Sequence, residues 1–394
     1  MTVTYTHEVA NARLSGFSSL LVRWKGSVYK LFYKEFLIYT VLYTIVSILY
    51  RTCFHGSNKV YFEKLCLQFQ SYTDLIPISF VLGFYVTLIV GRWWSQLEHL
   101  PFPDPLMLII GANVHGADDR GKMVRRTLLR YVNIAQVLTY RCVSTAVYKR
   151  FPTMDHVVAA GIMTKSEYSL YESIKTENLK YWVPFVWFSN LLSKLRQEGR
   201  IYDDMTYKLI LEELNTYRTH CGSLVNYDWI SVPLVYTQVV TVAVYMFFVS
   251  TLLSRQYLDP TMNYTGHEVD LYVPIFTICQ FFFYMGWLKV AEQLINPFGE
   301  DDDDFEVNWC IDRNLEISML AVDQMYSKHP KMQRDLYWNI PNPDVPYTAA
   351  SANHKVEPFM GSTFDMRLPK ENVQIPENRM DLLKDINDSK VNNQ

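Results

Sequence analysis

Residues 75–91 read Leu-Ile-Pro-Ile-Ser-Phe-Val-Leu-Gly-Phe-Tyr-Val-Thr-Leu-Ile-Val-Gly and contain no charged side chain. A helix needs about 20 mainly apolar residues to cross a bilayer, so this stretch predicts a membrane span. Residues 229–254 are equally free of charge. Apolar segments at about 31–50 and 271–288 are less clean, with Lys34 and Glu35 near the start of the first and Lys289 and Glu292 at the end of the other. The sequence therefore predicts an all-α membrane protein with four spans.

The composition agrees with a membrane protein and argues against a nucleic-acid binder. Hydrophobic residues make up 49% of the 394 positions and aromatic residues 15%, which is rich for a soluble domain. The formal net charge is −3, so no global basic surface is available for nucleic acid. The six cysteines form no C-x-x-C pair, which argues against a redox framework, and we do not expect Cys53 and Cys66 to pair.

Basic residues set the predicted orientation in the membrane. They gather before the first span and after the second, at Arg13, Arg23, Lys25, Lys30, Arg120, Lys122, Arg125, Arg126 and Arg130. By the positive-inside tendency both regions lie in the cytosol, and four spans return the C-terminus to the same side. The first thirty residues lack a long apolar core and a cleavage site, so we expect no removable signal peptide.

The long segment between the second and third spans has helical periodicity. An apolar face is formed by Val124, Leu128, Leu129, Val132, Ile134 and Val137. We expect Arg125, Arg126 and Arg130 to face elsewhere. Pro152 predicts a helix break, and a second helix is predicted at about 207–221. From about residue 340 prolines are spread through polar sequence, which is typical of an extended or disordered tail.

An acidic run follows the fourth apolar segment directly. Residues 296–306 read Asn-Pro-Phe-Gly-Glu-Asp-Asp-Asp-Asp-Phe-Glu, with six carboxylates in seven positions. Close carboxylates repel by on the order of a few kcal/mol per pair at an effective dielectric of about 20, so a folded run needs a compensating charge such as a hard cation. The alternative is a solvated acidic linker. Phe298 and Phe305 flank the run, and Pro297 and Gly299 punctuate it, which favours a formed loop.

The second apolar segment carries two stripes. Ile76, Phe80 and Phe84 recur at i, i+4 and i+8, and Ser79, Gly83 and Thr87 form a small-residue stripe beside them. One interpretation is a face that packs or meets lipid. The other is a pore wall, because small residues let identical helices approach closely and a bulky apolar constriction gates by dewetting. Phenyl ring edges carry partial positive charge, which suits a partly dehydrated anion.

Several long motifs of this chain resemble the bestrophins, the vertebrate ones in particular. The resemblance runs from Val3 to about Phe364 and rests on residues 76–87 (IPISFVLGFYVT), 92–94 (RWW), 143–152 (VSTAVYKRFP), 227–230 (YDWI), 233–238 (PLVYTQ) and 286–304 (GWLKVAEQLINPFGEDDDD). It implies a calcium-activated channel for chloride and bicarbonate, built as a homopentamer around one axial pore in the plasma membrane, with both termini cytosolic.

The resemblance also implies roles for individual residues. Ile76, Phe80 and Phe84 would form the hydrophobic neck that gates the pore. Met205 stands at the cytosolic aperture, where a small aliphatic residue or lysine is expected, so conductance and ion preference are left open. Separately, the sequon at Asn263 fits a glycosylation acceptor, although it lies close to the predicted membrane.

A calcium clasp is implied for the acidic run. Its ligands would be the carboxylates of Asp301 and Asp304 together with the backbone carbonyls of Ala10, Gln293 and Asn296. Calcium takes six to eight oxygen ligands and accepts carbonyls readily. Because one ligand comes from the N-terminal segment and the others follow the fourth span, a bound ion would join two cytosolic pieces beneath the gate.

Pattern and resemblance together divide the chain into six predicted parts. They are a cytosolic N-terminal segment (1–30), two spans with the neck (31–98), a cytosolic helical region with the aperture (99–227), two further spans (228–295), the clasp loop with a cytosolic helix (296–340), and an extended or disordered regulatory tail (341–394).

The sequence bears on three other functions. A metal-dependent membrane enzyme needs clustered histidines, and the nine histidines of this chain never stand at i, i+3 or i, i+4. A secondary transporter predicts internal duplication, which the sequence lacks. A regulatory or scaffolding subunit that modulates another channel would share every motif above, and it stays open as the alternative.

Overall fold

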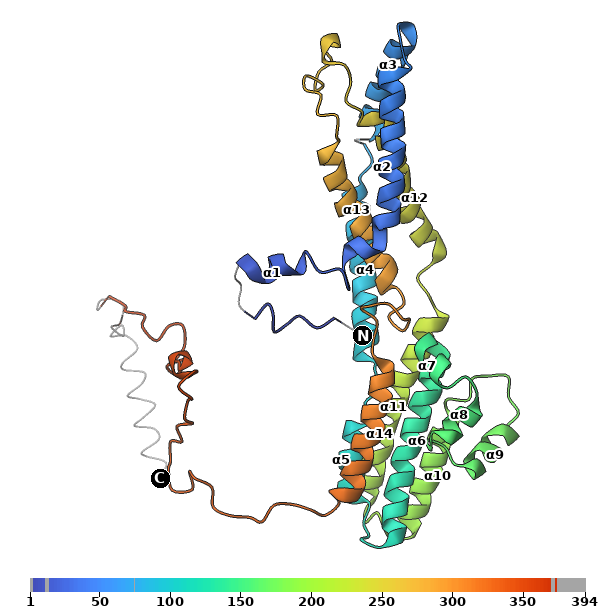
Figure 1. The fold of residues 1–394 in the computed structure, drawn as a ribbon. Coiled ribbons are helices and arrows are strands. Elements are labelled where there is room, and N and C mark those ends of the chain that lie inside the picture. Colours follow the sequence, from blue (N-terminus) through green and yellow to red (C-terminus); the bar gives the residue numbers. More distant parts are fainter. Residues whose placement is uncertain (1–2, 11–13, 74, 370–372, 374–394) are drawn as a thin grey trace, which may run out of the picture. The chain divides into compact units, whose positions relative to one another are not determined.

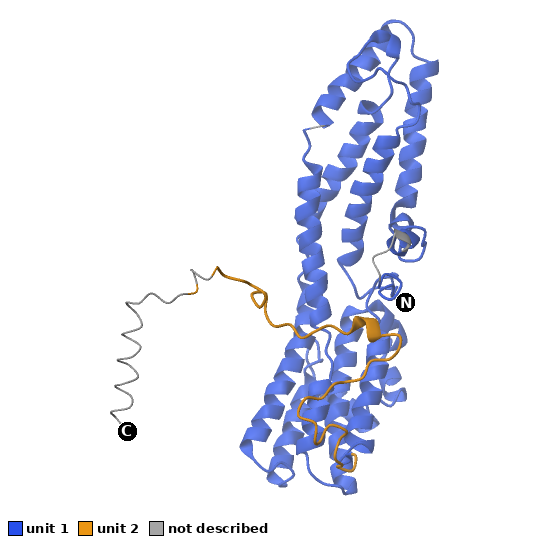
Figure 2. Cartoon of the chain, turned by 90° about the vertical axis from the view of Figure 1, so that its left-hand side faces the viewer, with its two compact units in different colours: residues 1–329 blue, residues 330–394 orange. Residues whose placement is uncertain are grey.

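The computed structural model describes residues 3–10, 14–73, 75–369 and 373. Parts of the predicted segments 1–30 and 341–394 therefore lie outside the described residues. Every regular element in the described part is helical, which confirms the predicted all-α class. Residues 1–329 form one unit and residues 330–394 another (Figure 2).

An apolar bundle occupies the upper part of unit 1 in Figure 1. Its helices are α2 (Val28–Thr52), α3 (Ser57–Thr73), α4 (Ile78–Glu98), α12 (Leu234–Ser254) and α13 (Ile275–Leu294). α12 packs against α3, α2 and α4, and α13 packs against α2 and α4. Aromatic rings fill the centre: Phe281 lies against Phe32, Tyr39 and Phe248 with ring centroids 4.7–6.0 Å apart.

Among the described residues, three helices are long and apolar enough to cross a membrane: α2, α4 and α12. α2 contains the first predicted span, and α4 and α12 contain all but the first few residues of the second and third. Most of the fourth predicted segment lies in the 20-residue helix α13, whose Lys289 pairs with Glu35 of α2 at 3.0 Å and with Glu292 at 2.8 Å. Paired charges of this kind are what a membrane bundle tolerates, and the four-span count stays a prediction.

A second bundle lies below the apolar one (Figure 1). It consists of α5 (Asp104–Asn113), α6 (Asp119–Val143), α7 (Thr145–Arg150), α8 (Met154–Ala159), α9 (Lys165–Ser173), α10 (Val183–Gln197), α11 (Asp204–Trp229) and α14 (Val307–Met319). α6 packs against α10, α11 and α14. The carboxylates of Asp118 and Asp203 cap α6 and α11 by accepting from backbone N–H groups. The break predicted at Pro152 separates α7 from α8, and α11 extends the helix predicted at 207–221.

Arg125 corrects the predicted outward orientation of the α6 arginines. Its side chain is only 2% exposed and donates to the carbonyl oxygens of Val114, Gly116 and Val322. The guanidinium also lies 3.3 Å from the ring centroid of Tyr326. Helical periodicity could not predict this burial because it results from the π-helical turn Leu320–Gln324 that covers this side of α6.

The remaining elements are short. They are α1 (Leu14–Leu20), the 3₁₀ turn Pro260–Met262 between α12 and α13, and the 3₁₀ turn Ala352–His354 in residues 330–394.

Candidate functional site

The helix α4 has one packed face and one exposed face. Leu82, Tyr85 and Ile89 are fully buried against the apolar bundle. Phe80 and Phe84 are 66% and 61% exposed, and their rings pack edge to face with centroids 4.8 Å apart. A single chain therefore leaves two large aromatic side chains of a membrane-type helix without a covering surface.

The other members of the two predicted stripes behave differently. Ile76 precedes α4, because the helix begins at Ile78 with Pro77 at its N-cap, and it is half-buried against the apolar core. A side chain at Gly83 would point to the ring of Trp287 on α13, 3.9 Å away, so this position packs within the chain. The close approach of identical helices through the small stripe stays a prediction.

Met205 lies in the first turn of α11 and is 76% exposed. The turn is fixed by Asp203, whose carboxylate accepts from the backbone N–H of Thr206 at 2.7 Å. The predicted aperture residue thus lies at the capped start of α11 with most of its surface exposed, and its role stays a prediction.

The acidic run is a folded loop. The backbone N–H of Phe305 donates to the carbonyl of Pro297 at 2.8 Å and closes it. Inside, the carboxylate of Asp304 accepts from the backbone N–H of Asp301 at 2.7 Å. Phe298 is 3% exposed and packs edge to face on Phe305 at 5.4 Å between ring centroids. The flanking phenylalanines therefore anchor the loop, as the sequence predicted.

Two carboxylates of the loop are compensated by lysines of the same chain. Asp302 accepts from the Lys30 ammonium at 2.6 Å and from the backbone N–H of Gly26 at 3.1 Å, and these bonds lower the pKa of Asp302. Glu300 accepts from Lys149 at 2.6 Å. Two of the six carboxylates are thus compensated within the chain, and one of the two lysines, Lys30, comes from its N-terminal part.

Asp303 and Asp304 lie in less hydrated surroundings. Asp304 is 6% exposed. Burial raises the pKa of both carboxyl groups, and neighbouring aspartates raise it further. A side chain at Gly299 would place its Cβ 2.7 Å from Asp304 Oδ2, so only glycine leaves room for this carboxylate. Negative charge is therefore held where water compensates it poorly.

The donor chemistry of the loop fits calcium. A cavity of about 210 Å³ is lined by Asp301, Asp304 and Asn308, among others. The Asn308 Oδ1 atom is buried and has no hydrogen-bond partner among the described residues. Carboxylate and amide oxygens around a small cavity are the ligands that calcium prefers.

Side chains supply only part of the predicted set of calcium ligands. Within residues 3–10, 14–73, 75–369 and 373, no three His, Cys, Asp or Glu side chains gather around one metal position. The predicted set takes three of its five ligands from backbone carbonyls, so its coordination does not depend on such a cluster. Gln293 contacts the loop by donating to Asp303 at 3.5 Å, Asn296 begins it, and Ala10 is exposed. All three ligand roles stay predictions.

One contact joins the acidic loop to α4, the helix that carries Phe80 and Phe84. The ring of Trp93, on α4, lies 5.3 Å from the ring of Phe305 between centroids. The sequence does not predict this contact. The motif at residues 92–94 stands out in the sequence, but no sequence pattern identifies Phe305 as the partner of Trp93. The acidic loop thus contacts the same helix, α4, that carries the exposed stripe.

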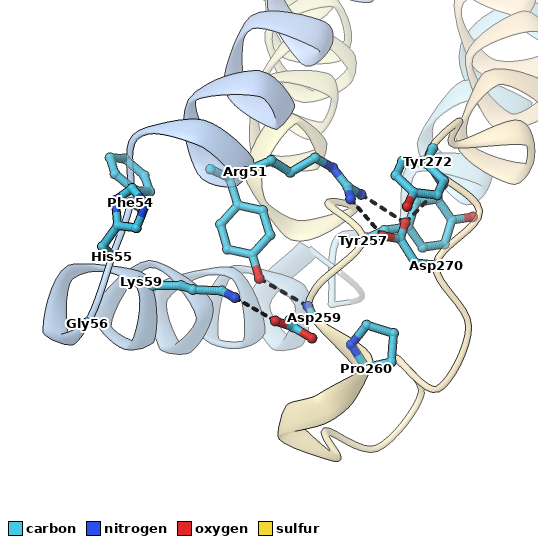
Figure 3. Close-up of a pocket in the computed structure, with 11 residues that line it drawn as sticks. Arg51, Phe54, His55, Gly56, Lys59, Tyr257, Asp259, Pro260, Asp270 and Tyr272 are labelled. Carbon is cyan, nitrogen blue, oxygen red and sulfur yellow. Dashed lines mark hydrogen bonds and ion pairs between the residues drawn. The ribbon is translucent and has the colours of Figure 1, made fainter.

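A further cavity of about 570 Å³ lies between the α2–α3 corner and the α12–α13 loop (Figure 3). Its charged lining is paired: Arg51 with Asp270 at 2.7 Å and Lys59 with Asp259 at 2.6 Å. Asn263, in the same loop, is exposed in a left-handed conformation with φ 54°. Its glycosylation stays a prediction.

Comparisons with known proteins agree on one family. A family model described as "Bestrophin, RFP-TM, chloride channel" matches residues 1–324. Human Bestrophin-3 is 58% identical over 368 residues, 93% of this chain and 55% of that protein. Human Bestrophin-1 is 57% identical over 97% of this chain and 65% of its own length, and mouse Bestrophin-2 is 58% identical over 95% and 74%. The chain thus spans little more than half of the first of these relatives.

The fold also resembles solved structures. A variant of a bacterial bestrophin homologue from Klebsiella pneumoniae superposes with a TM-score of 0.53 at 18% identity, covering 72% of this chain and 97% of its own. A second variant gives 0.54 at 17% identity, covering 75% and 99%. At such identities the likeness concerns the fold alone.

Proposed function

The chain belongs to the bestrophin family, which is described as a family of chloride channels, and we propose that it forms a calcium-activated anion channel. Chloride and bicarbonate are the proposed ions. The proposed assembly is a homopentamer around one axial pore in the plasma membrane, with four spans per subunit and both termini cytosolic.

The exposed stripe on α4 carries this proposal. Phe80 and Phe84 are more than 60% exposed on a helix whose opposite face is fully packed. In identical subunits around an axis, these rings would face one another and, with Ile76, line a narrow apolar neck. A constriction of this kind excludes ions by dewetting until it widens. No catalytic residue is needed.

The acidic loop supports calcium control of the neck. Asp301 and Asp304 would supply carboxylate ligands, and Ala10, Gln293 and Asn296 would supply carbonyl oxygens. When bound, the ion would supply positive charge where the chain holds desolvated aspartates. The Trp93–Phe305 contact offers a physical connection from this loop to the helix that carries the neck.

Contact with lipid is supported by the surface of α12. Most of its exposed residues are apolar, and they include Leu234, Val235, Val239, Val242, Met246 and Val249, whereas Gln238 is exposed and polar. A helix with this surface is stable when hydrocarbon surrounds it.

Reconstitution tests the proposal. The purified full chain in liposomes should release chloride when calcium reaches the micromolar range, and it should retain chloride in a chelator. The same chain with Asp304→Ala serves as the matched preparation, and its response should require more calcium. Silence of the wild-type protein at every calcium concentration would support the regulatory or scaffolding subunit instead.

A further inference from the structure

Two histidines come into contact where α4 meets α11. His99 is the C-cap residue of α4, and His220 lies on α11. Their ring centroids are 5.4 Å apart with the planes tilted by 52°, and both side chains are partly buried. The family's proposed neck and calcium clasp use neither residue.

The geometry of the pair matches two imidazoles that share a metal ion. A tetrahedral Zn²⁺ with Zn–N bonds of about 2.0 Å holds the centroids of two imidazole ligands about 5 Å apart. The observed separation of 5.4 Å is close to this value.

Hydrogen bonding prepares His99 as a ligand. Its Nδ1 lies 2.6 Å from the carbonyl oxygen of Ser95. A carbonyl oxygen only accepts, so Nδ1 must carry the proton, and Nε2 keeps its lone pair for a metal. Metal-binding histidines commonly show this arrangement, in which a backbone carbonyl fixes the tautomer and the ring orientation.

The charges around His220 also suit a cation. Burial and the neighbouring His99 lower the pKa of His220, so its ring is neutral near pH 7, the form that binds metal. Glu213, two turns earlier on α11, acts on His220 in the opposite direction and would attract a cation. Tyr227 lies edge-on to His99 at 5.9 Å, and Arg92 lies on the Tyr227 ring at 5.1 Å.

We propose that His99 and His220 together bind a divalent transition-metal ion such as Zn²⁺ and thereby link α4 to α11. Two protein nitrogens with solvent in the other positions make a site of moderate affinity, because a closed structural zinc site takes four protein ligands. Imidazole ligands favour zinc, copper and nickel over calcium and magnesium, so the site is chemically distinct from the acidic loop.

The position of the site suggests its effect. α4 carries Phe80 and Phe84, and α11 begins beside Met205, so a bridging ion would restrain both proposed constrictions relative to each other. This effect on current rests on the proposed channel function, whereas the binding of the metal does not.

Zinc binding can be measured directly. The full chain in detergent, with calcium chelated by a reagent of low zinc affinity, is titrated with ZnCl₂ against a chromophoric zinc competitor. The wild type should bind one ion per chain, and His99→Gln or His220→Gln should each weaken binding about tenfold or more. The control is His156→Gln, an exposed histidine on α8, which should bind like the wild type.

Measurements of thermal stability and of rescue by cysteine distinguish loss of the zinc site from loss of folding. The melting temperature without zinc should be similar in all variants, and zinc should raise it only where both histidines are present. A variant with His99→Cys and His220→Cys, kept reduced, should bind zinc again through its thiolates. Equal zinc affinity in the wild type and in the double Gln variant would overturn the site.

A flux measurement separates this inference from the proposed function. In liposomes, zinc should reduce calcium-activated chloride release by the wild type and not by the double Gln variant. Zinc binding without any flux would overturn the channel and leave the site intact. Calcium-activated flux that is insensitive to zinc in both proteins, together with equal zinc affinity in both, would overturn the site and leave the channel intact.

Discussion

The aromatic stripe on α4 and the acidic loop after α13 lie in different environments within a single chain. Phe80 and Phe84 are more than 60% exposed, so what they lack is apolar contact. Asp304 is only 6% exposed and burial raises its pKa, so the charged form of this carboxylate is poorly hydrated. An exposed apolar patch can be covered by another copy of the chain, and a nearby cation stabilises a desolvated negative charge. The first region therefore suggests assembly and the second suggests regulation.

Removing the apolar bulk of the stripe should have the largest effect. With Ile76, Phe80 and Phe84 all changed to alanine, chloride release without calcium should rise to about the level that the wild type reaches with calcium. The reason is that a wider, less bulky neck stays wet. Liposome flux in chelator measures it.

A control on α12 distinguishes the neck from general loosening of the bundle. Val239, Val242 and Met246 are also exposed and apolar, and their joint change to alanine should leave calcium dependence intact. Persisting calcium dependence in the neck variant would place the gate elsewhere.

The acidic loop should give the next largest effect, and two of its aspartates make a matched pair. Asp304→Ala should raise the calcium concentration for half-maximal flux about tenfold or more, because it removes a carboxylate ligand. Asp302 is held by Lys30 at 2.6 Å, so Asp302→Ala should change the calcium requirement much less. Equal shifts in the two variants would contradict the assignment of Asp304 as a ligand and of Asp302 as part of the scaffold.

The two regions were not equally visible in the sequence. Apolar runs and a dense charge cluster are local signals, so the helices, the anchored loop and the stripe at Phe80 and Phe84 could be predicted. The orientation of Gly83 toward Trp287 and the burial of Arg125 depend on which element packs beside them. Periodicity along one helix carries no information about such a neighbour.

The same reason explains the contacts that sequence reasoning missed altogether. His99 and His220 are far apart in the chain, and spacing rules for metal ligands apply only within one helix or loop. Trp93 and Phe305 each stand in a recognisable motif, but only the fold brings the two motifs together.

The contact between the two regions should give a smaller effect. An aromatic pair contributes about 0.5–1.5 kcal/mol beyond burial, so Trp93→Leu and Phe305→Leu should each shift the calcium requirement about two- to tenfold. If the pair transmits the signal, the double variant should shift no further than either single one. Trp94→Leu, an exposed neighbour, is the control and should have little effect. Additive shifts would mean that the rings act independently.

The smallest effect should appear in stability, with opposite signs at two adjacent aspartates. Burial raises the pKa of Asp303, so its charged form disfavours the folded state at neutral pH, and this penalty fades as the pH falls through the raised pKa. Lys30 lowers the pKa of Asp302, so the charge of that carboxylate favours folding, and this contribution is lost as the pH falls through the lowered pKa.

The two isosteric amide variants separate these contributions. In calcium-free buffer at pH 7, Asp303→Asn should raise the melting temperature by about 1–2 °C, and Asp302→Asn should lower it by a similar amount. At pH 5 the gain from Asp303→Asn should shrink, because the wild-type carboxyl group is then closer to protonation, while the loss from Asp302→Asn should persist. Differential scanning fluorimetry at both pH values measures these shifts. Shifts of the same sign would mean that the loop responds to its total charge and not to the separate surroundings of each aspartate.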